Sequence, residues 1–363
     1  MRRGEAPAAA GSRFGRRRLL RAAGGAAAAG IGGTVWLAGG ASPWRLAAQE
    51  EAQFFRIGTG PTTGSYFTIG GIIANAISNP PGSRPCESGG SCGVPGLIAI
   101  AQTTRGSIQN VDLVASKSLD SGLCQSDVAF WAYSGNGPYS GSKPLEGLRA
   151  IANLYQESLH VVVRADSPIE SIGDLKGKRV SLGERGAGTR ATAILVLGAY
   201  GVGEKRFVGR QLPIAEATAQ LRDGKIDAVF LVGSAPVPAL AELAQTTPLR
   251  MLPVVGEAGE KLRREHPFLT VDIVPEGSYG DAAAAVTVGI GTYWLVLAGL
   301  DDELAFGITK SLWHIATRKL LDQGGPLGRR IRVEHALVGL PIPIHPGAER
   351  YYAEPHEPDR GVE

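Results

Sequence analysis

The 363-residue sequence has few of the side chains from which metal and catalytic centres are usually built. Its six histidines show no metal-ligand spacing, and its three cysteines form no CxxC pair. Structural zinc sites usually need four ligands at short spacings, so no metal is expected. Ser65, Ser107 and Ser134 do not lie in the Gly-x-Ser-x-Gly pattern of a nucleophile elbow. We therefore expect no catalytic residue, no cofactor and no enzyme activity.

The chain also lacks a basic region suited to nucleic acid. The net charge is +3, but residues 1–48 hold eight arginines and only one acid. Without that segment, the totals of 37 basic and 34 acidic residues leave a net charge of about −4. No nucleic-acid partner is expected for such a body.

The basic start of the chain has the pattern of an export signal. Arg16 and Arg17 precede two leucines, followed by an Ala- and Gly-rich stretch at residues 22–40. That stretch is less apolar than a typical membrane-spanning helix, and small residues follow it. Paired arginines resemble the twin-arginine variety. We predict a signal over residues 1–48 and a periplasmic mature protein; the alternative is a signal retained as a membrane anchor.

The cysteines fit an oxidising compartment. Cys86 and Cys92 lie in a loop rich in Gly, Ser and Pro, and we predict a disulfide between them. Metal binding by the pair is the competing interpretation. Cys124 is left over and is expected to be a buried free thiol.

Beyond residue 53, short apolar strands alternate with helical patterns, which is typical of α/β proteins with mostly parallel sheets. The length predicts about two domains. A long β-rich segment at 283–297 is expected to return the chain to the first domain. The patterns predict strands at 54–58, 111–115, 128–130, 148–155, 159–164 and 227–232, and helices at 65–78, 117–124, 189–200, 216–223 and 304–321.

Two glycine-rich turns lead from a predicted strand into a predicted helix, at 56–71 and 183–190. The first departs from GxGxxG because its third glycine comes one residue late, and it lacks the Lys-Ser/Thr of a phosphate loop. A third turn, 103–110, carries hydroxyls and an amide. Each alone is equally well explained as an ordinary loop. Together they favour a clamp for a small anion, because helix N-termini attract negative charge.

Two further polar residues have competing interpretations. His160 lies on an apolar strand and is predicted to be a hydrogen-bonded core residue rather than a catalytic base. Asp127 either caps a turn or belongs to the site.

Several ordered blocks of the chain resemble the TAXI group of solute-binding proteins of tripartite ATP-independent periplasmic (TRAP) transporters. The resemblance covers about residues 54–354. Its blocks are IGTGPTTGSYF (57–67), TTRGSIQNV (103–111), CQSDVAFWAY (124–133), the long segment 148–190, LRDGKIDAVF (221–230) and IPIHPGAERYYAE (342–354).

This resemblance implies a two-lobe periplasmic binding protein fold, type II-like, with each lobe a mostly parallel sheet flanked by helices and joined by hinge strands. We expect lobe I at 53–158 and 283–354, lobe II at 159–282, and a tail at 355–363. The resemblance further implies a monomeric receptor for a small carboxylate-bearing solute, an amino acid or dicarboxylate, delivered to a TRAP-type permease.

We expect ligand contacts from both lobes. Where the family commonly has GSGT, this chain has GAGT followed by Arg190, which adds a cation. Arg190 is expected to meet an anionic ligand group, and Arg105, on a more exposed part of its loop, to contribute less. The expected binding residues are Thr59, Gly60, Tyr66, Ser107, Asn110 and Asp127 from lobe I, and Gly188, Thr189 and Arg190 from lobe II. A periplasmic sensor of the same solute, or an enzyme on this scaffold, are the alternatives.

Overall fold

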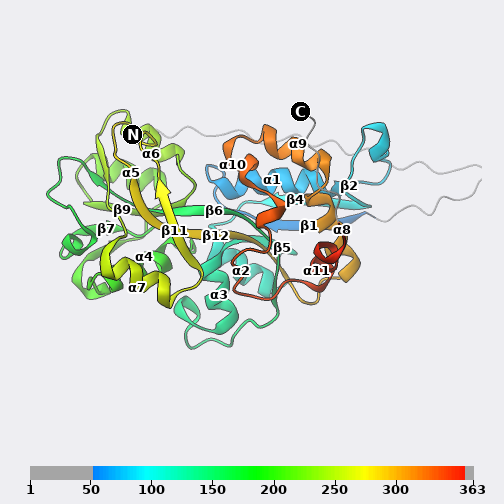
Figure 1. Cartoon of the computed structure of the whole chain (residues 1–363), viewed down its shortest axis with the longest axis horizontal. Coiled ribbons are helices and arrows are strands. Elements are labelled where there is room, and N and C mark those ends of the chain that lie inside the picture. Colours follow the sequence, from blue (N-terminus) through cyan, green and yellow to red (C-terminus); the bar gives the residue numbers. More distant parts are fainter. Residues whose placement is uncertain (1–51, 356–363) are drawn as a thin grey trace, which may run out of the picture. The chain divides into compact units, whose positions relative to one another are not determined.

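The computed structural model describes residues 52–355 (Figure 1). The predicted export signal, and the tail from residue 356, lie outside the described residues. The described part forms a two-lobed α/β fold, as expected, but the strands of both lobes belong to one ten-stranded sheet. Its strands are β1 (Gln53–Gly58), β4 (Leu97–Gln102), β5 (Ser121–Gln125), β6 (Leu148–Arg164), β7 (Arg179–Ser181), β8 (Val208–Arg210), β9 (Ala228–Gly233), β10 (Leu249–Met251), β11 (Leu269–Val274) and β12 (Ala285–Leu297).

The sheet is parallel toward both ends and antiparallel in the middle. β4, β1 and β5 are parallel neighbours in the first lobe, and β9, β7 and β8 are parallel neighbours in the second. Between them lie the two long strands β6 and β12, which pair antiparallel with each other and extend into both lobes (Figure 1). β10 pairs with β6 and β11 with β12. A separate small sheet joins β2 (Ser78–Asn79) and β3 (Val94–Pro95).

Helices cover both faces of the sheet. In the first lobe, α1 and α8 pack with β1 in one apolar core, while α2 and α3 contribute to another. In the second lobe, α4 and α7 belong to this second core, and α5 and α6 to a third. The helices are α1 (Ser65–Ile77), α2 (Ser107–Ala115), α3 (Ser126–Ser134), α4 (Thr189–Ala199), α5 (Ile214–Arg222), α6 (Pro238–Ala244), α7 (Gly256–Glu265), α8 (Asp302–Leu312), α9 (Ile315–Gln323), α10 (Pro326–Arg330) and α11 (Pro346–Ala353).

β6 corrects the sequence-based prediction of two strands at 148–155 and 159–164. The polar residues between them, 156–158, had indicated a break, but the strand continues through them. Most of its side chains are buried, since helices cover both faces. Glu157 is itself buried and accepts hydrogen bonds from three hydroxyls, so the strand tolerates it. The predicted β segment at 283–297 is β12.

The segment 107–134 was predicted wrongly. The predicted strand at 111–115 belongs to α2, the predicted helix at 117–124 overlaps β5, and the predicted strand at 128–130 belongs to α3. The apolar run at 111–115 resembles a strand by composition, but Ser107, Asn110, Val111 and Val114 are buried at helical spacing. β5 is short and rich in small and polar residues, yet all five of its residues are buried between β1 and β12.

The predicted helix at 304–321 is two helices, α8 and α9. His314 ends the continuity, because its Nδ1 accepts the backbone N–H of Ala316 at 3.1 Å and so begins α9. The indole of Trp313 donates to the Tyr352 hydroxyl at 2.8 Å. Polar contacts therefore hold the chain at the point where α8 ends and α9 begins.

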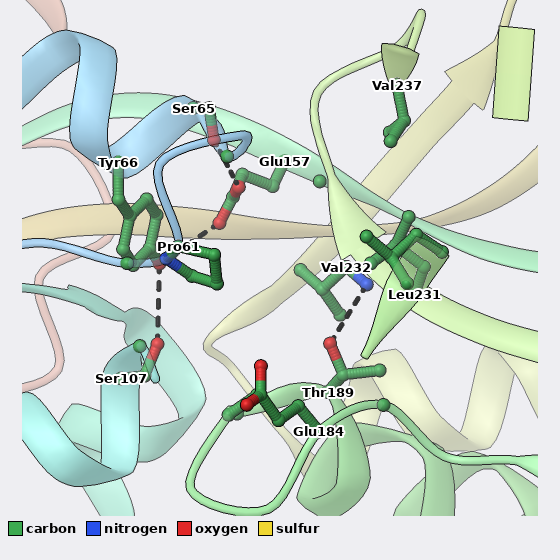
Figure 2. Close-up of a pocket in the computed structure, with 18 of the residues that line it drawn as sticks. Pro61, Ser65, Tyr66, Ser107, Glu157, Glu184, Thr189, Leu231, Val232 and Val237 are labelled. Atoms are coloured by element: carbon green, nitrogen blue, oxygen red, sulfur yellow. Dashed lines mark hydrogen bonds between the residues drawn. The ribbon is translucent and has the colours of Figure 1, made fainter. Parts of the chain in front are cut away.

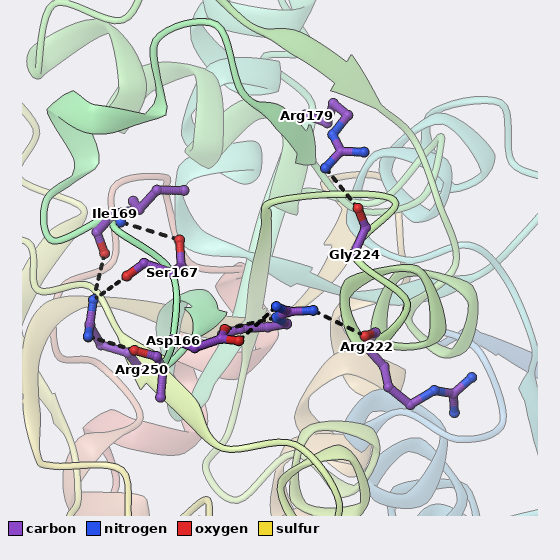
Figure 3. A network of polar contacts seen from close by, with 9 residues as sticks. Asp166, Ser167, Ile169, Arg179, Arg222, Gly224 and Arg250 are labelled. Carbon is purple, nitrogen blue, oxygen red and sulfur yellow. Dashed lines mark hydrogen bonds and ion pairs between the residues drawn. The ribbon is translucent and has the colours of Figure 1, made fainter.

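Polar contacts also fasten the loop that follows β6 in the second lobe (Figure 3). Arg250, on β10, donates to the carbonyls of Ala165 at 2.7 Å and of Ser167 and Ile169 at 3.0 Å. Arg179 forms a forked pair with Asp227 and donates to the carbonyl of Gly224.

His160 is a hydrogen-bonded core residue as predicted, and burial lowers its pKa to about 4.

The cysteines pair as predicted. Cys86 and Cys92 form a disulfide, and Cys124 is a buried free thiol. His314 lies beside the pair, but a disulfide leaves no thiolates for a metal. Ser91, in the same loop, lies in a Gly-x-Ser-x-Gly sequence. It does not join a strand to a helix as a nucleophile elbow does, and its hydroxyl donates to the carbonyl of Ser78.

Candidate ligand-binding site

A cavity lies between the two lobes and is lined by residues of both (Figure 2). It encloses about 1000 Å³, its open mouth included. The first lobe contributes the turns after β1 and β4, together with Gln125 and Glu157. The second contributes the turn before α4, the strand β9 and the residues that follow it. Segments far apart in the sequence therefore form its walls.

Three helix N-termini point their first turns at this cavity. Gly64 and Ser65 of α1, Gly106 and Ser107 of α2, and Gly188 and Thr189 of α4 all line it. Each of these helices has a glycine at its N-cap, and none has a side-chain capping hydrogen bond. The first N–H groups of a helix have no partner within the helix, and they carry a partial positive charge. The cavity therefore presents three N-termini without side-chain caps to a bound anion, although at α2 the N–H of Gln109 already donates to the carbonyl of Gly186 at 3.2 Å.

Gly188 shows why glycine is needed at one of these turns. A Cβ on Gly188 would lie 1.4 Å from Oε1 of Gln125 and 3.0 Å from Cγ2 of Val128. Gln125 and Val128 belong to the first lobe, and Gly188 to the second. The two lobes thus approach more closely here than any side chain at this position would allow.

Some expected ligand residues lie in the wall behind the turns rather than at the cavity. The carbonyl of Thr59 accepts hydrogen bonds from Thr104 at 3.0 Å and from Asn110 at 2.6 Å. Asn110 also donates to the carbonyl of Leu123 at 2.7 Å. Neither Thr59 nor Asn110 lines the cavity. Their bonds fix the β1 turn against α2 and β5, which holds the N-terminus of α1 in place.

Asp127 connects the lobes instead of lining the cavity. Its Oδ2 accepts the hydroxyl of Thr192, on α4, at 2.5 Å, and its Oδ1 accepts the backbone N–H of Val128 at 2.7 Å. Burial raises its pKa to about 6, while these hydrogen bonds oppose that shift. Asp127 therefore does not cap α3, whose N-cap is Gln125, and instead forms a bond between α3 and α4.

The two arginines exchange the roles expected of them. Arg190 does not line the cavity: as the second residue of α4 it points outward, and its guanidinium pairs with Glu204 at 2.8 Å. Arg105 does line the cavity, with its stem against Gly186. Among the described lining residues, Arg105 is the one Lys, Arg or His. The cation of this site is thus Arg105.

Glu157 is the site residue that sequence analysis missed. Its carboxylate accepts the hydroxyls of Ser65 at 3.3 Å and of Tyr66 at 3.1 Å (Figure 2). It also accepts the hydroxyl of Thr292 at 3.1 Å. Tyr66 also lies 3.4 Å from the Ser107 hydroxyl. The signal in the sequence was an acid between two apolar runs, but it marked a break in the strand equally well.

The wall contributed by the second lobe is mostly apolar. Two hydroxyls interrupt it: the Oγ atoms of Ser181 and Ser234 are buried and have no hydrogen-bond partner among the described residues. The hydroxyl of Thr189, by contrast, accepts the backbone N–H of Val232 at 3.2 Å. The apolar lining consists of Leu212, Ile214, Ala217, Val229, Phe230, Leu231, Val232, Val237 and Pro238.

Comparison with known families places the chain. Residues 57–355 match the model of the NMT1-like family, and the chain belongs to that family. Within residues 52–355, no helix is both long and apolar enough to span a membrane.

Similar solved structures include the periplasmic aliphatic sulphonate-binding protein SsuA from Escherichia coli, with 16% identity over 84% of this chain and 80% of that chain and a TM-score of 0.44. CAE31940 from Bordetella bronchiseptica RB50 has 16% identity over 80% of this chain and 79% of that chain, with a TM-score of 0.48. An ancestral arginine-binding protein bound to arginine has 15% identity over 75% of this chain and 98% of that chain, with a TM-score of 0.43. Similarity at this level does not identify the ligand of this chain.

Proposed function

We propose that this chain is an extracytoplasmic solute receptor that binds a small carboxylate-bearing solute between its two lobes and delivers it to a membrane permease. The observation that carries the proposal is the convergence of three helix N-termini without side-chain caps on one cavity between the lobes. Ser181 gives independent support, because a buried hydroxyl without a partner at the cavity wall is suited to a polar ligand atom.

The carboxylate would lie among the first turns of α1, α2 and α4, close to Arg105. Of the residues predicted from sequence, Gly60, Tyr66, Ser107, Gly188 and Thr189 line the cavity and are proposed to contact the solute. Thr59, Asn110 and Asp127 would act by positioning these contacts. Binding that draws on both lobes would favour their closed arrangement, as a population shift requires.

The transport partner and the route of export belong to the same proposal. The ordered motifs that resemble TAXI proteins support a TRAP-type permease as partner, and the paired arginines support twin-arginine export to the periplasm. Uptake of the solute by cells that carry this chain with a TRAP-type permease, compared with cells that carry the permease alone, would test the partner.

The test of binding compares two arginines. The solute is first found by a thermal-shift screen of amino acids and dicarboxylates on the mature protein. Arg105→Ala should then weaken its binding by about ten- to a hundredfold in calorimetry, the usual cost of a lost charge-assisted contact. Arg190→Ala is the matched control and should bind like wild type, because its partner is the exposed Glu204. If no carboxylate-bearing compound stabilises the protein, or if the two variants behave in the opposite way, the proposed site is wrong.

A further inference from the structure

Glu157 is a buried carboxylic acid that the packing of the fold does not explain. It lies inside β6 with 3% of its surface exposed, yet it lines the cavity. Within residues 52–355, no Lys, Arg or His forms an ion pair with it. Burying a carboxylate without a cation is costly, and that cost is normally met by pairing or protonation.

The hydrogen bonds of Glu157 leave it ready to accept one more donor. A carboxylate has about four acceptor positions, and the hydroxyls of Ser65, Tyr66 and Thr292 occupy three of them. Burial raises the pKa to about 7, whereas these hydroxyls stabilise the ionised form. A positively charged ligand group at the remaining position would complete the set and offset the burial of the charge.

The rest of the cavity limits what else the solute carries. Of the described lining residues, Arg105 is the single cation, whereas Glu157 and Glu184 are both acids. One carboxylate is already placed at the helix N-termini and Arg105. A second carboxylate would face either an acid or the wall of the second lobe, which offers it the neutral hydroxyls of Ser181 and Ser234 but no cation to offset the loss of its hydration.

We infer, building on the proposed receptor function, that the solute is an amino acid with an apolar side chain. Its carboxylate lies at the N-termini of α1, α2 and α4, its ammonium group donates to Glu157, and its side chain packs against the apolar residues of β9, α5 and α6. Glu157 is therefore a specificity-determining residue, and dicarboxylates are excluded by the same geometry.

The experiment uses three ligands that differ in one group each. L-leucine carries all three features, 4-methylpentanoate lacks only the amino group, and succinate differs from 4-methylpentanoate in that a second carboxylate replaces the apolar end. By calorimetry, wild-type protein should bind leucine about ten- to a hundredfold more tightly than 4-methylpentanoate, as expected for one charge-assisted contact. Succinate should bind no better than 4-methylpentanoate.

Two variants test the residue. Glu157→Gln should bring leucine and 4-methylpentanoate to within about threefold of each other, because it keeps the shape and removes the charge. Glu184→Gln, which removes the other acid of the cavity, should preserve the preference. The inference is overturned if wild type binds 4-methylpentanoate as tightly as leucine, if succinate binds best, or if Glu184→Gln abolishes the preference and Glu157→Gln keeps it.

These outcomes are separable from failure of the proposed function. Tight binding of 4-methylpentanoate or succinate leaves a carboxylate receptor in place and removes only the role of Glu157. If no carboxylate-bearing compound binds, the receptor function fails as well. Should Glu157→Gln fail to fold, the leucine preference of wild type and of Glu184→Gln still decides the matter.

Discussion

Replacing Gly188 with alanine should obstruct the contact between the lobes. The new methyl group would lie 1.4 Å from Oε1 and 2.6 Å from Cδ of Gln125, far inside van der Waals contact. Gln125 is buried, and its Oε1 accepts the Ser107 hydroxyl at 3.5 Å, so moving it disturbs a second lining residue. Overpacking of this kind costs about 1–3 kcal/mol. If the clash exists only while the lobes are together, affinity should fall by roughly 5- to 150-fold.

Gly198→Ala is the matched control for this substitution. Gly198 belongs to the same helix, is exposed, and has no atom within 4 Å of its added Cβ. It should keep wild-type affinity and gain about 0.5–1 kcal/mol of stability, because alanine favours a helix interior. Both variants would be measured by calorimetry with the solute and by urea unfolding without it. Gly188→Ala should lose affinity while its unfolding free energy changes by less than about 1 kcal/mol. Wild-type affinity in Gly188→Ala would refute the reasoning.

Two further predictions concern stability. For Glu157, burial raises the folded pKa from 4.5 to about 7, so its contribution to stability is present below about pH 4.5 and is lost as the pH rises toward 7. Wild type should therefore lose about 2–3 kcal/mol more than Glu157→Gln between pH 5 and pH 8 in ligand-free urea unfolding. The buried Asp127 titrates in both proteins, and the raised pKa values of Cys124, Tyr66 and Tyr155 keep these groups protonated. Equal pH slopes would contradict the buried-acid interpretation. For the disulfide, protein unfolded without reductant should show one titratable thiol, Cys124. The double variant Cys86→Ser/Cys92→Ser should lose about 2 kcal/mol of unfolding free energy, a small value because the closed loop is short. Three titratable thiols would show that the bond does not form.

The sequence by itself determined the features that depend on local chemistry. Alternating apolar runs and helical spacings predicted β1, α1, α4 and β12, because the period of side-chain burial is set by backbone geometry. Cys86 and Cys92 were close enough in a flexible loop to predict their bond. Glycines before a helix indicated ligand approach, and the turns at 60–66, 105–107 and 183–189 do line one cavity.

Only the tertiary structure decided which side chains of those turns face the cavity. Arg190 and Arg105 both occupy glycine-rich turns. The direction of each side chain depends on its place in the turn and on its spatial neighbour, which is Glu204 for Arg190 and Gly186 for Arg105. The sequence does not show that these residues are neighbours. In the sequence, Glu157 indicated a break in a strand, because the partners of its carboxylate are far away along the chain. They lie on α1 and β12, and Tyr66 and Thr292 are 91 and 135 residues from Glu157. The pairing of β6 with β12 brings Thr292 to Glu157, and no local pattern encodes that register. The placement of α1 brings Ser65 and Tyr66 to the same carboxylate.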